Sequence, residues 1–526
     1  MVQRSGTARK VGAPSHDQPV GADHGVPSAS MQNFTALARA VMRRLAPLLL
    51  LPALLVGLAH AADRPHIVYI MADDLGWQDL GYLGKEVHTP NLDRLAAGAV
   101  KLNQFYVQPY SSQTRAALLT GRYPMRYGLQ TQSILPDSRY GLPLDERTLP
   151  QALKKAGYRT ALVGQWRLGQ FKPEYRPNRR GFDYHYGPLG GQIDPTRKTG
   201  PAGADWWRND HPVKEEGYAT TLLGKDAAGL IAKHDPSTPL FLMLAFTAPA
   251  APLQAPREFL VRNGSIRDET RRTYAAMVTA LDDAAGMVAT ALEHRGMLDH
   301  TLIVFHSDNG GAIAHKFATG DGDIARGGAD NGPYRDGMGT FYEGGVRVAA
   351  FMRWNKGLES GLYNGLMHVT DLYPTLLGIA GAKGDQRRPL DGIDQFASIA
   401  GGRISPRKEL LLGIDELRGA IRVGDWKLIL HSSLPQQLEL YDVPHDPGEE
   451  DNAADRNPDL VKTLLGKLND YAWEMAPSRF MDELKHARRS DMPIVWGQNP
   501  IRHGATSESD SRNDPSLTTE RADRPK

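Results

Sequence analysis

The sequence predicts an α/β protein built on a large mixed or parallel sheet, with a small antiparallel sheet and a helix near the C-terminus. The first observation is a set of short, apolar, β-branched runs that indicate buried strands; they are Arg64–Ala72, Thr160–Gly164, Pro239–Thr247 and Thr301–Ser307. The second is that segments with helical spacing separate these runs, which is the β/α alternation of such a sheet. The third is a change of pattern after Gly401-Gly402, where strand-like segments replace this alternation.

The helices expected between the strands follow ordinary start rules. Thr89–Ala96 carries Pro90 in its first turn, and Leu149–Ala156 precedes the second strand. Arg272–Arg295 has apolar residues at helical spacing with charges opposite, which predicts an amphipathic helix against the sheet. The elements expected near the C-terminus are, in order, strands at Arg422–Ile429 and Glu439–Asp442 and a closing helix at Pro458–Met475.

Composition excludes several classes of protein. With 526 residues and 41% hydrophobic content, the chain is long enough for one large domain and a smaller one. The net charge is only +2, from 62 basic and 60 acidic residues, so the chain lacks the basic excess of a nucleic-acid-binding protein. There is no cysteine, which excludes both a disulfide framework and a thiolate zinc site.

The N-terminus predicts export. Residues 1–41 form a polar extension that we expect to be disordered, and residues 42–61 have the basic, apolar and Ala-x-Ala layout of a signal peptide cleaved after Ala61. A membrane anchor is the alternative, but the apolar run is shorter than the ~20 residues that span a bilayer. We therefore expect a secreted or periplasmic protein with no membrane span after cleavage, an α/β domain over 62–400, a small subdomain over 401–492 and a polar tail over 493–526.

Acidic and amide side chains follow two of the predicted strands. Asp73 and Asp74 come directly after the first strand, and Asp308 and Asn309 follow the last one. Open α/β sheets bind ligands at the carboxyl ends of their strands. Three carboxylates and one amide make an all-oxygen set that suits Ca²⁺ or Mg²⁺ and not zinc. Solvated turn carboxylates and an independent Asn-Gly turn are the alternatives for each pair taken alone.

A second candidate site lies in Gln108–Tyr123, which we expect to be a loop followed by the start of a helix. Ser111 and Arg115 would lie one helical turn apart, where a helix N-terminus already favours an anion. That arrangement suits a nucleophile beside a charged ester. The alternative is that Ser111 is only an N-cap.

These motifs, in this order between Pro65 and Met475, resemble the sulfatases, specifically the arylsulfatase branch of the alkaline-phosphatase superfamily. The resemblance rests above all on TRAALLTGRYPMRYGLQ and TPNLDRLAAGAV. It implies an alkaline-phosphatase-like α/β/α sandwich and a sulfuric ester hydrolase. It also implies one Ca²⁺ on Asp73, Asp74, Asp308 and Asn309, and a formylglycine made from Ser111, whose hydrate attacks sulfur next to Arg115.

The chain departs from the family at several site positions. Gln113 stands where the family has Pro or Ala, and Gln165 and Arg167 replace a sulfate-binding Lys and a His that hydrogen-bonds the hydrate. Ala250 replaces a His that protonates the leaving alcohol, and Met338 replaces the second sulfate-binding Lys. Glutamine carries no charge, arginine is not a base at neutral pH, and a thioether cannot replace an ammonium. Acid help alone is worth roughly 10²–10⁴-fold in rate.

Three functional hypotheses follow. The first is a sulfatase-like pseudoenzyme that folds, holds one divalent cation, binds a sulfated or other anionic ester near Arg115 and Arg167, and is inactive or strongly impaired. The second is a working arylsulfatase-like hydrolase in which Ser111, as formylglycine or unmodified, is activated by calcium and Arg167 anchors the sulfate. The third, a two-zinc phosphatase, lacks a second cluster of His and Asp ligands.

Trp206 and Arg208 lie in a loop that the resemblance leads us to expect near the substrate. They either stack on a ligand or serve packing.

Overall fold

The computed structural model describes residues 64–316, 324–382, 384, 387–432 and 435–491. The described residues from Arg64 onward belong to one compact unit. The expected N-terminal extension, signal peptide and C-terminal tail lie outside the described residues, so those three expectations stay predictions.

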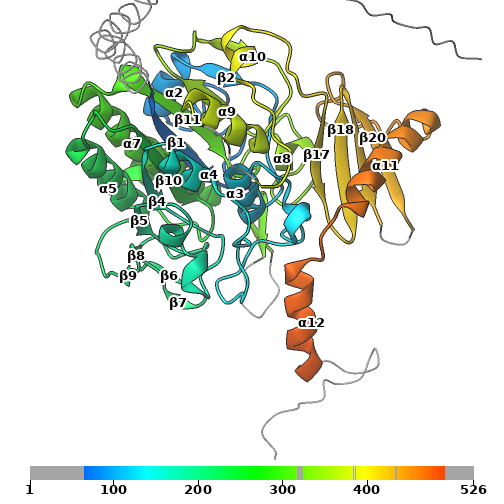
Figure 1. The fold of residues 1–526 in the computed structure, drawn as a ribbon, viewed down its shortest axis with the longest axis horizontal. Helices are drawn as coiled ribbons and strands as arrows, with labels where there is room; N and C mark the ends of the chain where they lie inside the picture. Colours follow the sequence, from blue (N-terminus) through cyan, green and yellow to red (C-terminus); the bar gives the residue numbers. More distant parts are fainter. Residues whose placement is uncertain (1–63, 317–323, 383, 385–386, 433–434, 492–526) are drawn as a thin grey trace, which may run out of the picture. The chain divides into compact units, whose positions relative to one another are not determined.

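A ten-stranded mixed sheet forms the centre of the protein (Figure 1), and its strand order is β15-β2-β14-β11-β1-β10-β4-β5-β8-β9. The central strands β11, β1, β10, β4 and β5 are parallel, whereas β14 and β8 join antiparallel to the two sides of this group. The strands are β1 (His66–Asp73), β2 (Val100–Leu102), β4 (Arg159–Gly164), β5 (Tyr184–Gly187), β8 (Trp207–Arg208), β9 (His211–Pro212), β10 (Leu240–Pro249), β11 (Thr301–Ser307), β14 (Ala350–Arg353) and β15 (Gly361–Tyr363). Each of the four strands predicted from apolar runs is present.

Helices cover both faces of this sheet, and they bury β1 on both sides. Its alternate residues Val68 and Ile70 pack in a core with α2 (Pro90–Ala97), α5 (Ala219–Lys233) and α7 (Glu269–His294). Residues Ile67, Tyr69 and Met71 pack in a second core, with helices α3 (Ser111–Thr120), α4 (Leu149–Lys155) and α9 (Leu372–Ile379). Successive side chains of a strand point to opposite faces, so a strand without polar alternation predicts two covered faces.

Helix α7 is the one described helix that is long and apolar enough to span a membrane by length and composition. The structure buries 78% of its most apolar window inside the protein. The residues that α7 places in the core include Ala275, Val278, Leu281 and Ala285, which contact the sheet side of the protein. Its hydropathy is therefore accounted for by packing in the core.

The small sheet is antiparallel, with the order β17-β18-β19-β20. One of its faces packs Ile421 and Leu428 against Leu464 and Leu468 of α11 (Pro458–Trp473), and its other face packs on Tyr106 of the α/β part. The strands are β17 (Glu409–Ile414), β18 (Arg418–Val423), β19 (Trp426–His431) and β20 (Gln437–Asp442). The helix α10 (Phe396–Ala400) ends just before this region, and a domain boundary near 401 stays a prediction.

One predicted strand is wrong as drawn from the sequence. Arg422–Ile429 is not continuous, because Gly424 and Asp425 form the turn between β18 and β19. Gly424 has φ of 57°, a left-handed conformation that glycine adopts without a steric cost. The shorter described elements are β3 (Phe105–Tyr106), β6 (Thr199–Gly200), β7 (Gly203–Ala204), β12 (Ala314–Lys316), β13 (Ile324–Arg326), β16 (Met367–His368), α6 (Arg257–Arg262), α8 (Glu343–Val346) and α12 (Arg479–Asp491), with 3-10 turns at Pro124–Tyr127, Pro173–Tyr175, Pro177–Arg179, Leu298–His300 and Val369–Asp371.

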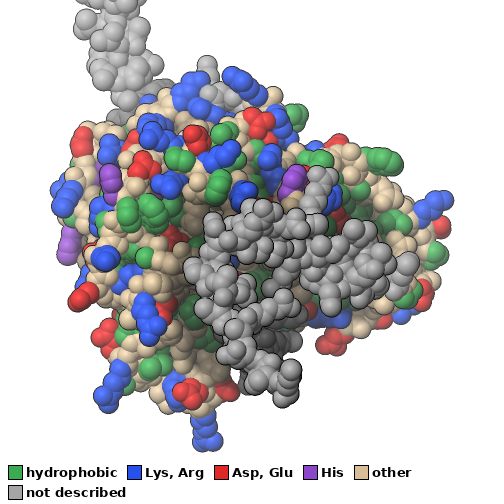
Figure 2. Space-filling view, turned by 90° about the horizontal axis from the view of Figure 1, so that it is seen from below, with side chains coloured by type: hydrophobic (Ala, Val, Ile, Leu, Met, Phe, Trp, Pro, Cys, Tyr) green, Lys and Arg blue, Asp and Glu red, His purple; other side chains and the backbone are tan. Residues whose placement is uncertain are grey.

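Charges of both signs occur together on one face of the protein. Figure 2 shows Lys and Arg side chains interspersed with Asp and Glu side chains on the face that it presents. This distribution agrees with the net charge of +2.

Candidate functional site

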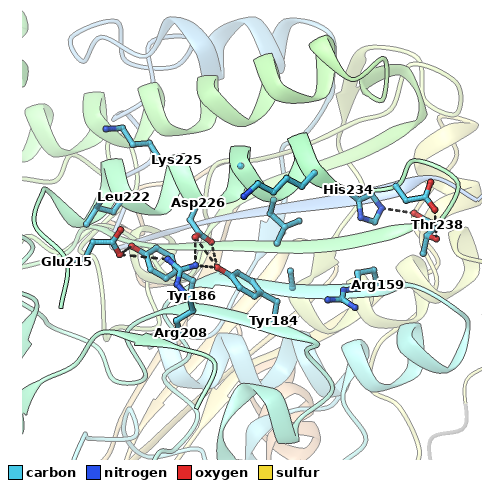
Figure 3. Close-up of a pocket in the computed structure, with 15 residues that line it drawn as sticks. Arg159, Tyr184, Tyr186, Arg208, Glu215, Leu222, Lys225, Asp226, His234 and Thr238 are labelled. Carbon is cyan, nitrogen blue, oxygen red and sulfur yellow. Dashed lines mark hydrogen bonds and ion pairs between the residues drawn. The ribbon is translucent and has the colours of Figure 1, made fainter. Parts of the chain in front are cut away.

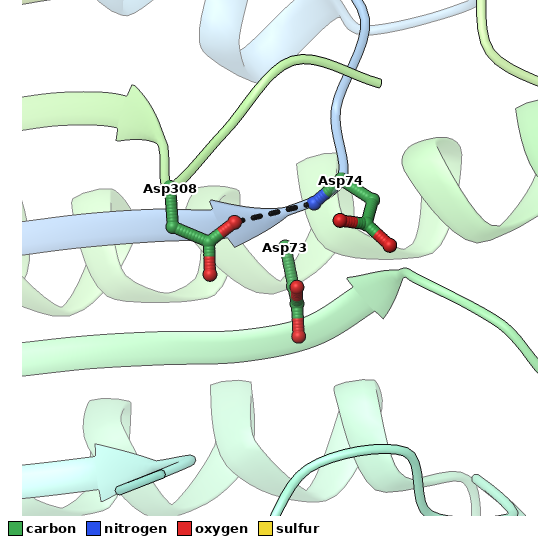
Figure 4. Close-up of side chains that lie close together, drawn as sticks. All are labelled: Asp73, Asp74 and Asp308. Carbon is green, nitrogen blue, oxygen red and sulfur yellow. Dashed lines mark hydrogen bonds between the residues drawn. The ribbon is translucent and has the colours of Figure 1, made fainter. Parts of the chain in front are cut away.

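The structure brings the predicted acidic residues together at one edge of the central sheet. Asp73 ends β1, Asp74 follows it, and Asp308 follows β11, whose last residue pairs with Ala72 in parallel register. One oxygen from each of the three carboxylates can be chosen so that all lie within 4.8 Å of one another (Figure 4). Their exposed fractions are 1%, 6% and 0%. Parallel strands end at the same edge of a sheet, which is why residues more than two hundred positions apart meet here.

The cluster is electrostatically unfavourable by itself. Burial, followed by the charge of Asp73, raises the pKa of Asp308 from 3.8 to about 7 against the opposing effects of Arg115 and Arg167. Burial, followed by Asp73 and Asp308, also raises the pKa of Asp74 well above its usual value. Like charges in a dry site disfavour ionisation unless a cation lies between them.

Asn309 completes an oxygen-rich set around these carboxylates. Its amide nitrogen donates to Asp74 Oδ1 at 2.6 Å, and its amide oxygen accepts from Ser111 Oγ at 3.2 Å. Three buried carboxylates and an amide oxygen fit the hard, oxygen-seeking cations Ca²⁺ and Mg²⁺. Within the described part of the chain, no other group of three or more His, Cys, Asp and Glu residues comes close enough to hold an ion.

Ser111 and Arg115 lie on the first turns of α3 and point at the carboxylate cluster. Ser111 is the first residue of α3 and not its N-cap, which is Tyr110, so the N-cap interpretation is wrong. Ser111 Oγ donates to Asp73 Oδ1 at 3.1 Å. Arg115 is 1% exposed and donates to Asp308 Oδ2 at 3.0 Å and to the Gln165 carbonyl at 3.2 Å.

Gln113 turns away from this cluster. Its side-chain amide donates to the carbonyl of Gln130, and both residues are buried. Gln113 therefore holds the chain that follows α3 and makes no described hydrogen bond with Ser111.

Gln165 and Arg167 extend the site from the carboxyl end of β4. Gln165 is fully buried, and neither its amide nitrogen nor its amide oxygen has a hydrogen-bond partner among the described residues. Arg167 has φ of 60°, and its guanidinium donates to Asp73 Oδ2 at 3.2 Å. A buried amide without partners is costly, so an unpaired Gln165 beside Arg115 indicates that a polar group from a ligand or solvent contacts it.

Gly191 makes room for Arg167, and the sequence did not reveal this role. A Cβ at Gly191 would lie 2.5 Å from Arg167 Cζ and 2.6 Å from its Nε. Asp205 fixes the neighbouring segment, because it accepts from the backbone N–H groups of Leu189 at 2.9 Å and Gly190 at 2.7 Å. The only sequence indication was the double glycine itself.

Ala250 and Met338 lie on turns next to the strand ends that carry the cluster. Asp73 pairs in register with Pro249, so Ala250 follows the partner of a cluster residue. The backbone N–H of Met338 donates to the Gly311 carbonyl at 3.2 Å, two residues beyond Asn309. Neither side chain has an ionisable atom, so neither can exchange a proton or balance a charge there.

Tyr274 of α7 holds the backbone at Asp74, a contact that the sequence did not predict. Its hydroxyl donates to the Asp74 carbonyl at 3.1 Å and contacts Asp79 Oδ2 at 2.7 Å. The Gly76 backbone N–H donates to the same hydroxyl at 3.0 Å. A lone tyrosine on a helix face of small apolar residues was the available indication.

The Trp206 loop serves packing, which was one of its two interpretations. Trp206 is 3% exposed and lies edge-on to Tyr186, with ring centroids 5.3 Å apart. Arg208 pairs with Asp226 at 2.7 Å, and its strand β8 is separated from β1, which carries Asp73, by β10, β4 and β5. Among the described residues, neither side chain forms a hydrogen bond with the carboxylate cluster.

Comparisons with known proteins agree with the motifs. The Sulfatase family model matches residues 65–382. Arylsulfatase J of Mus musculus is 34% identical over 494 residues, covering 83% of this chain and 80% of the relative. Arylsulfatase A of Homo sapiens is 34% identical over 473 residues, covering 80% and 90%. The crystal structure of Ps i-CgsB in complex with k-i-k-neocarrahexaose has 31% identity and a TM-score of 0.72, covering 82% of this chain and 98% of that one. The expected alkaline-phosphatase-like fold is confirmed.

Proposed function

Because this chain belongs to the sulfatase family, we propose that it is a cation-holding sulfatase-like protein with little or no sulfuric ester hydrolase activity. The proposal rests on one contrast within the site. The oxygen ligands Asp73, Asp74, Asp308 and Asn309 lie together, whereas Gln165, Arg167, Ala250 and Met338 provide no base and no ammonium around them.

Calcium is the cation that we propose, with magnesium as the alternative. The donor set of three carboxylates and one amide oxygen supports a hard divalent ion. When bound, such an ion supplies positive charge and Lewis acidity beside the Ser111 hydroxyl. Asp74 and Asp308, whose pKa values are raised by burial and by the charge of Asp73, would then stay ionised near neutral pH.

Loss of proton transfer supports the proposal of low activity. A sulfate ester with a poor leaving group needs an acid for the leaving oxygen and cations for the sulfuryl oxygens. The described histidine near the cluster, His306, is buried and already engaged, since its Nε2 contacts the Tyr69 hydroxyl and its Nδ1 contacts the Ser307 carbonyl. Burial lowers the pKa of His306 to about 4, so it does not replace the missing imidazoles.

The ligand that we propose is a sulfated sugar or another anionic ester. Arg167 keeps 13% of its side chain exposed, and the Gln165 amide is buried with no hydrogen-bond partner among the residues that the structure describes. Together they offer N–H donors to ester oxygens. A related protein of 31% identity was crystallised with k-i-k-neocarrahexaose, which supports a saccharide as the carrier of the ester.

One observation favours a working hydrolase as the second candidate. Ser111 Oγ lies 3.1 Å from Asp73 Oδ1, so its proton already has an acceptor in the cation site. In that case Ser111, as formylglycine or unmodified, attacks the ester while Arg167 anchors the sulfate.

Turnover of 4-nitrophenyl sulfate by the calcium-loaded protein separates the two candidates. We expect the same background rate for the wild type and Ser111→Ala. A matched variant that restores the family residues, Gln165→Lys, Arg167→His, Ala250→His and Met338→Lys, tests whether the site can be rebuilt. Turnover by the wild type that Ser111→Ala abolishes would establish the second candidate. Mass analysis of the peptide containing Ser111 then decides between serine and formylglycine, which has two hydrogens fewer.

We also propose export to the periplasm or beyond, on the basis of residues 42–61. Sequencing the mature protein from a periplasmic extract should give Ala62 as the first residue. A protein that stays in the cytoplasm with residues 42–61 attached would contradict export without affecting the site proposal.

A further inference from the structure

A groove of about 850 Å³ lies on the α5 side of the central sheet (Figure 3). One wall is a single face of α5, formed by residues at helical spacing: Leu222, Lys225, Asp226, Gly229, Leu230 and Lys233. Tyr184 and Tyr186 of β5 and Ala161 of β4 form the floor, and Arg159 and His234 lie at one end. We call this feature the α5 groove.

The α5 groove is separate from the carboxylate cluster. Arg159 is the first residue of β4, whereas Gln165 of the candidate site follows the last one. Ala161 also packs in the core that contains α5, and Ser111 lies on a helix of the opposite layer. A ligand in the groove therefore contacts neither Ser111 nor the carboxylate cluster of Asp73, Asp74 and Asp308.

The wall of the groove has open space at Gly229. Gly229 lies in the interior of α5, and a Cβ at this position would have no heavy atom within 4 Å. A glycine in a helix interior costs about 1 kcal/mol relative to alanine. Close packing of α5 therefore does not require a glycine at this position.

The carboxylates in the groove already have partners. Asp226 pairs with Arg208 Nη1 at 2.7 Å and accepts from the Tyr184 hydroxyl at 2.8 Å. Glu215 accepts from the Tyr186 hydroxyl at 2.5 Å and lies 3.9 Å from Arg208. The third carboxylate, Asp235, caps the turn at Ser237.

Three cations of the groove are in the opposite situation. Arg159, Lys225 and Lys233 are exposed, and within the described part of the chain their side chains have no hydrogen-bond or ion-pair partner. Lys225 and Lys233 are eight residues apart on one helix, which places their backbones about 12 Å apart. Positive charge is therefore available at both ends of the groove. Between the two ends lie Asp226 and Glu215, which are already paired with tyrosine hydroxyls and Arg208.

We propose that the α5 groove binds an anionic oligosaccharide. Its negative groups would pair with Lys225 at one end and with Arg159 and Lys233 at the other. Its hydroxyl groups would donate to Asp226 and Glu215, whose carboxylate oxygens can accept further hydrogen bonds. A nucleic acid fits less well, because its closely spaced phosphates would pass those carboxylates, and the four cations of the groove exceed its three carboxylates by only one.

The test measures binding by the mature, calcium-loaded protein in low salt. The probes are a sulfated hexasaccharide, a hexagalacturonate, a neutral maltohexaose and a single-stranded DNA hexamer. We expect at least one of the two acidic sugars to bind. Which of them binds shows whether the groove prefers sulfate or carboxylate groups. Lys225→Glu with Lys233→Glu should weaken that binding at least tenfold, and Gly229→Phe should weaken it by filling the groove.

Matched controls locate the site. Lys462→Glu changes an exposed lysine on α11 and should leave binding unchanged. The circular dichroism spectrum and the melting temperature, both measured in EDTA, report that each variant is folded. The proposal is overturned if neither acidic sugar binds, if maltohexaose or DNA binds as tightly as the acidic sugars, or if the double charge reversal does not alter binding. Because groove binding should be the same in calcium and in EDTA, failure here and failure of the proposed cation site are distinguishable.

Discussion

Two buried charge clusters in this protein differ in how their negative charge is balanced. Among the described residues, two guanidinium groups contact the carboxylate cluster of Asp73, Asp74 and Asp308, those of Arg115 and Arg167. The second, which we call the glutamate cluster, contains Glu343 and Glu449 together with three cations. Its cations are Lys427, Arg347 and Arg422.

The glutamate cluster contains more cations than carboxylates, although burial and the charge of Glu343 raise the pKa of Glu449 to about 7 against the effect of Lys427. Lys427 is 0% exposed and lies 3.1 Å from Glu343 and 2.7 Å from Glu449. Burial alone would raise the pKa of Glu343, but Lys427, Arg422 and Arg347 lower it to about 2. Lys427 belongs to β19 and Glu343 to α8, so this cluster joins the small sheet to the α/β part.

The difference teaches where an external cation is needed. In the carboxylate cluster, burial and neighbouring carboxylates outweigh the two arginines and raise the pKa of Asp308 to about 7. A cluster that contains its own cations has a structural role, whereas one short of positive charge is suited to hold an ion. The following experiments test this distinction, from the largest expected effect to the smallest.

Removing the central cation of the glutamate cluster should have the largest effect. Lys427→Met leaves two buried carboxylates with too little positive charge, and we expect a loss of about 3–5 kcal/mol in the free energy of unfolding. Urea denaturation followed by circular dichroism measures it. Arg456→Ala, which breaks an exposed pair with Asp451, is the control and should cause no measurable change. A Lys427→Met protein as stable as the control would show that the glutamate cluster does not stabilise the fold.

Supplying a cation should stabilise the other cluster. At a concentration one hundred times its Kd, Ca²⁺ should add about 2.7 kcal/mol, because it binds the folded chain and not the unfolded one. Differential scanning calorimetry in calcium and in EDTA measures the shift in Tm. Asp74→Asn should remove most of that shift. An unchanged Tm in calcium would mean that the carboxylates do not form a cation site.

In EDTA, stability should fall as the pH rises. The pKa of Asp308 is raised from 3.8 to about 7 in the folded protein, so folding takes up a proton between these pH values. Between pH 6 and 7 the loss should be at most about 1.4 kcal/mol for one proton. Unfolding free energies of the wild type and Asp308→Asn at pH 6 and 7 isolate this group, since only the wild type should show the extra slope. Calcium should remove the slope, and equal slopes in both proteins would contradict the assignment.

The smallest expected effect concerns Arg167. Its guanidinium donates to Asp73 Oδ2 at 3.2 Å, so it competes with a cation for a ligand oxygen. Arg167→Met should tighten calcium binding about threefold, since removing one partly solvated positive charge is worth less than about 1 kcal/mol. Isothermal titration calorimetry measures the Kd, with Arg262→Met on the protein surface as the control. Weaker calcium binding in Arg167→Met would mean that Arg167 organises the site instead of competing for it.

Much of the fold and the proximity of the candidate metal ligands were accessible from the sequence. The buried strands appear as continuous apolar runs, and Asp73, Asp74, Asp308 and Asn309 could be placed together because each pair lies at the carboxyl end of a strand. This inference is local in each segment and needs one rule of topology, that parallel strands end at the same edge. The break at Gly424 was missed because the apolar pattern continues on both sides of the turn.

Other features depended on the tertiary structure. The role of Gly191 beside Arg167, the support of Asp74 by Tyr274, and the pairing of Lys427 with Glu343 join residues far apart in the chain. The α5 groove likewise arises where α5 meets β4 and β5, and no single segment predicts it. Periodicity in sequence determines which side chains are buried, because burial depends on the pattern of one element. Only packing decides which buried groups touch, and therefore which charges are balanced within the protein and which are left for a ligand.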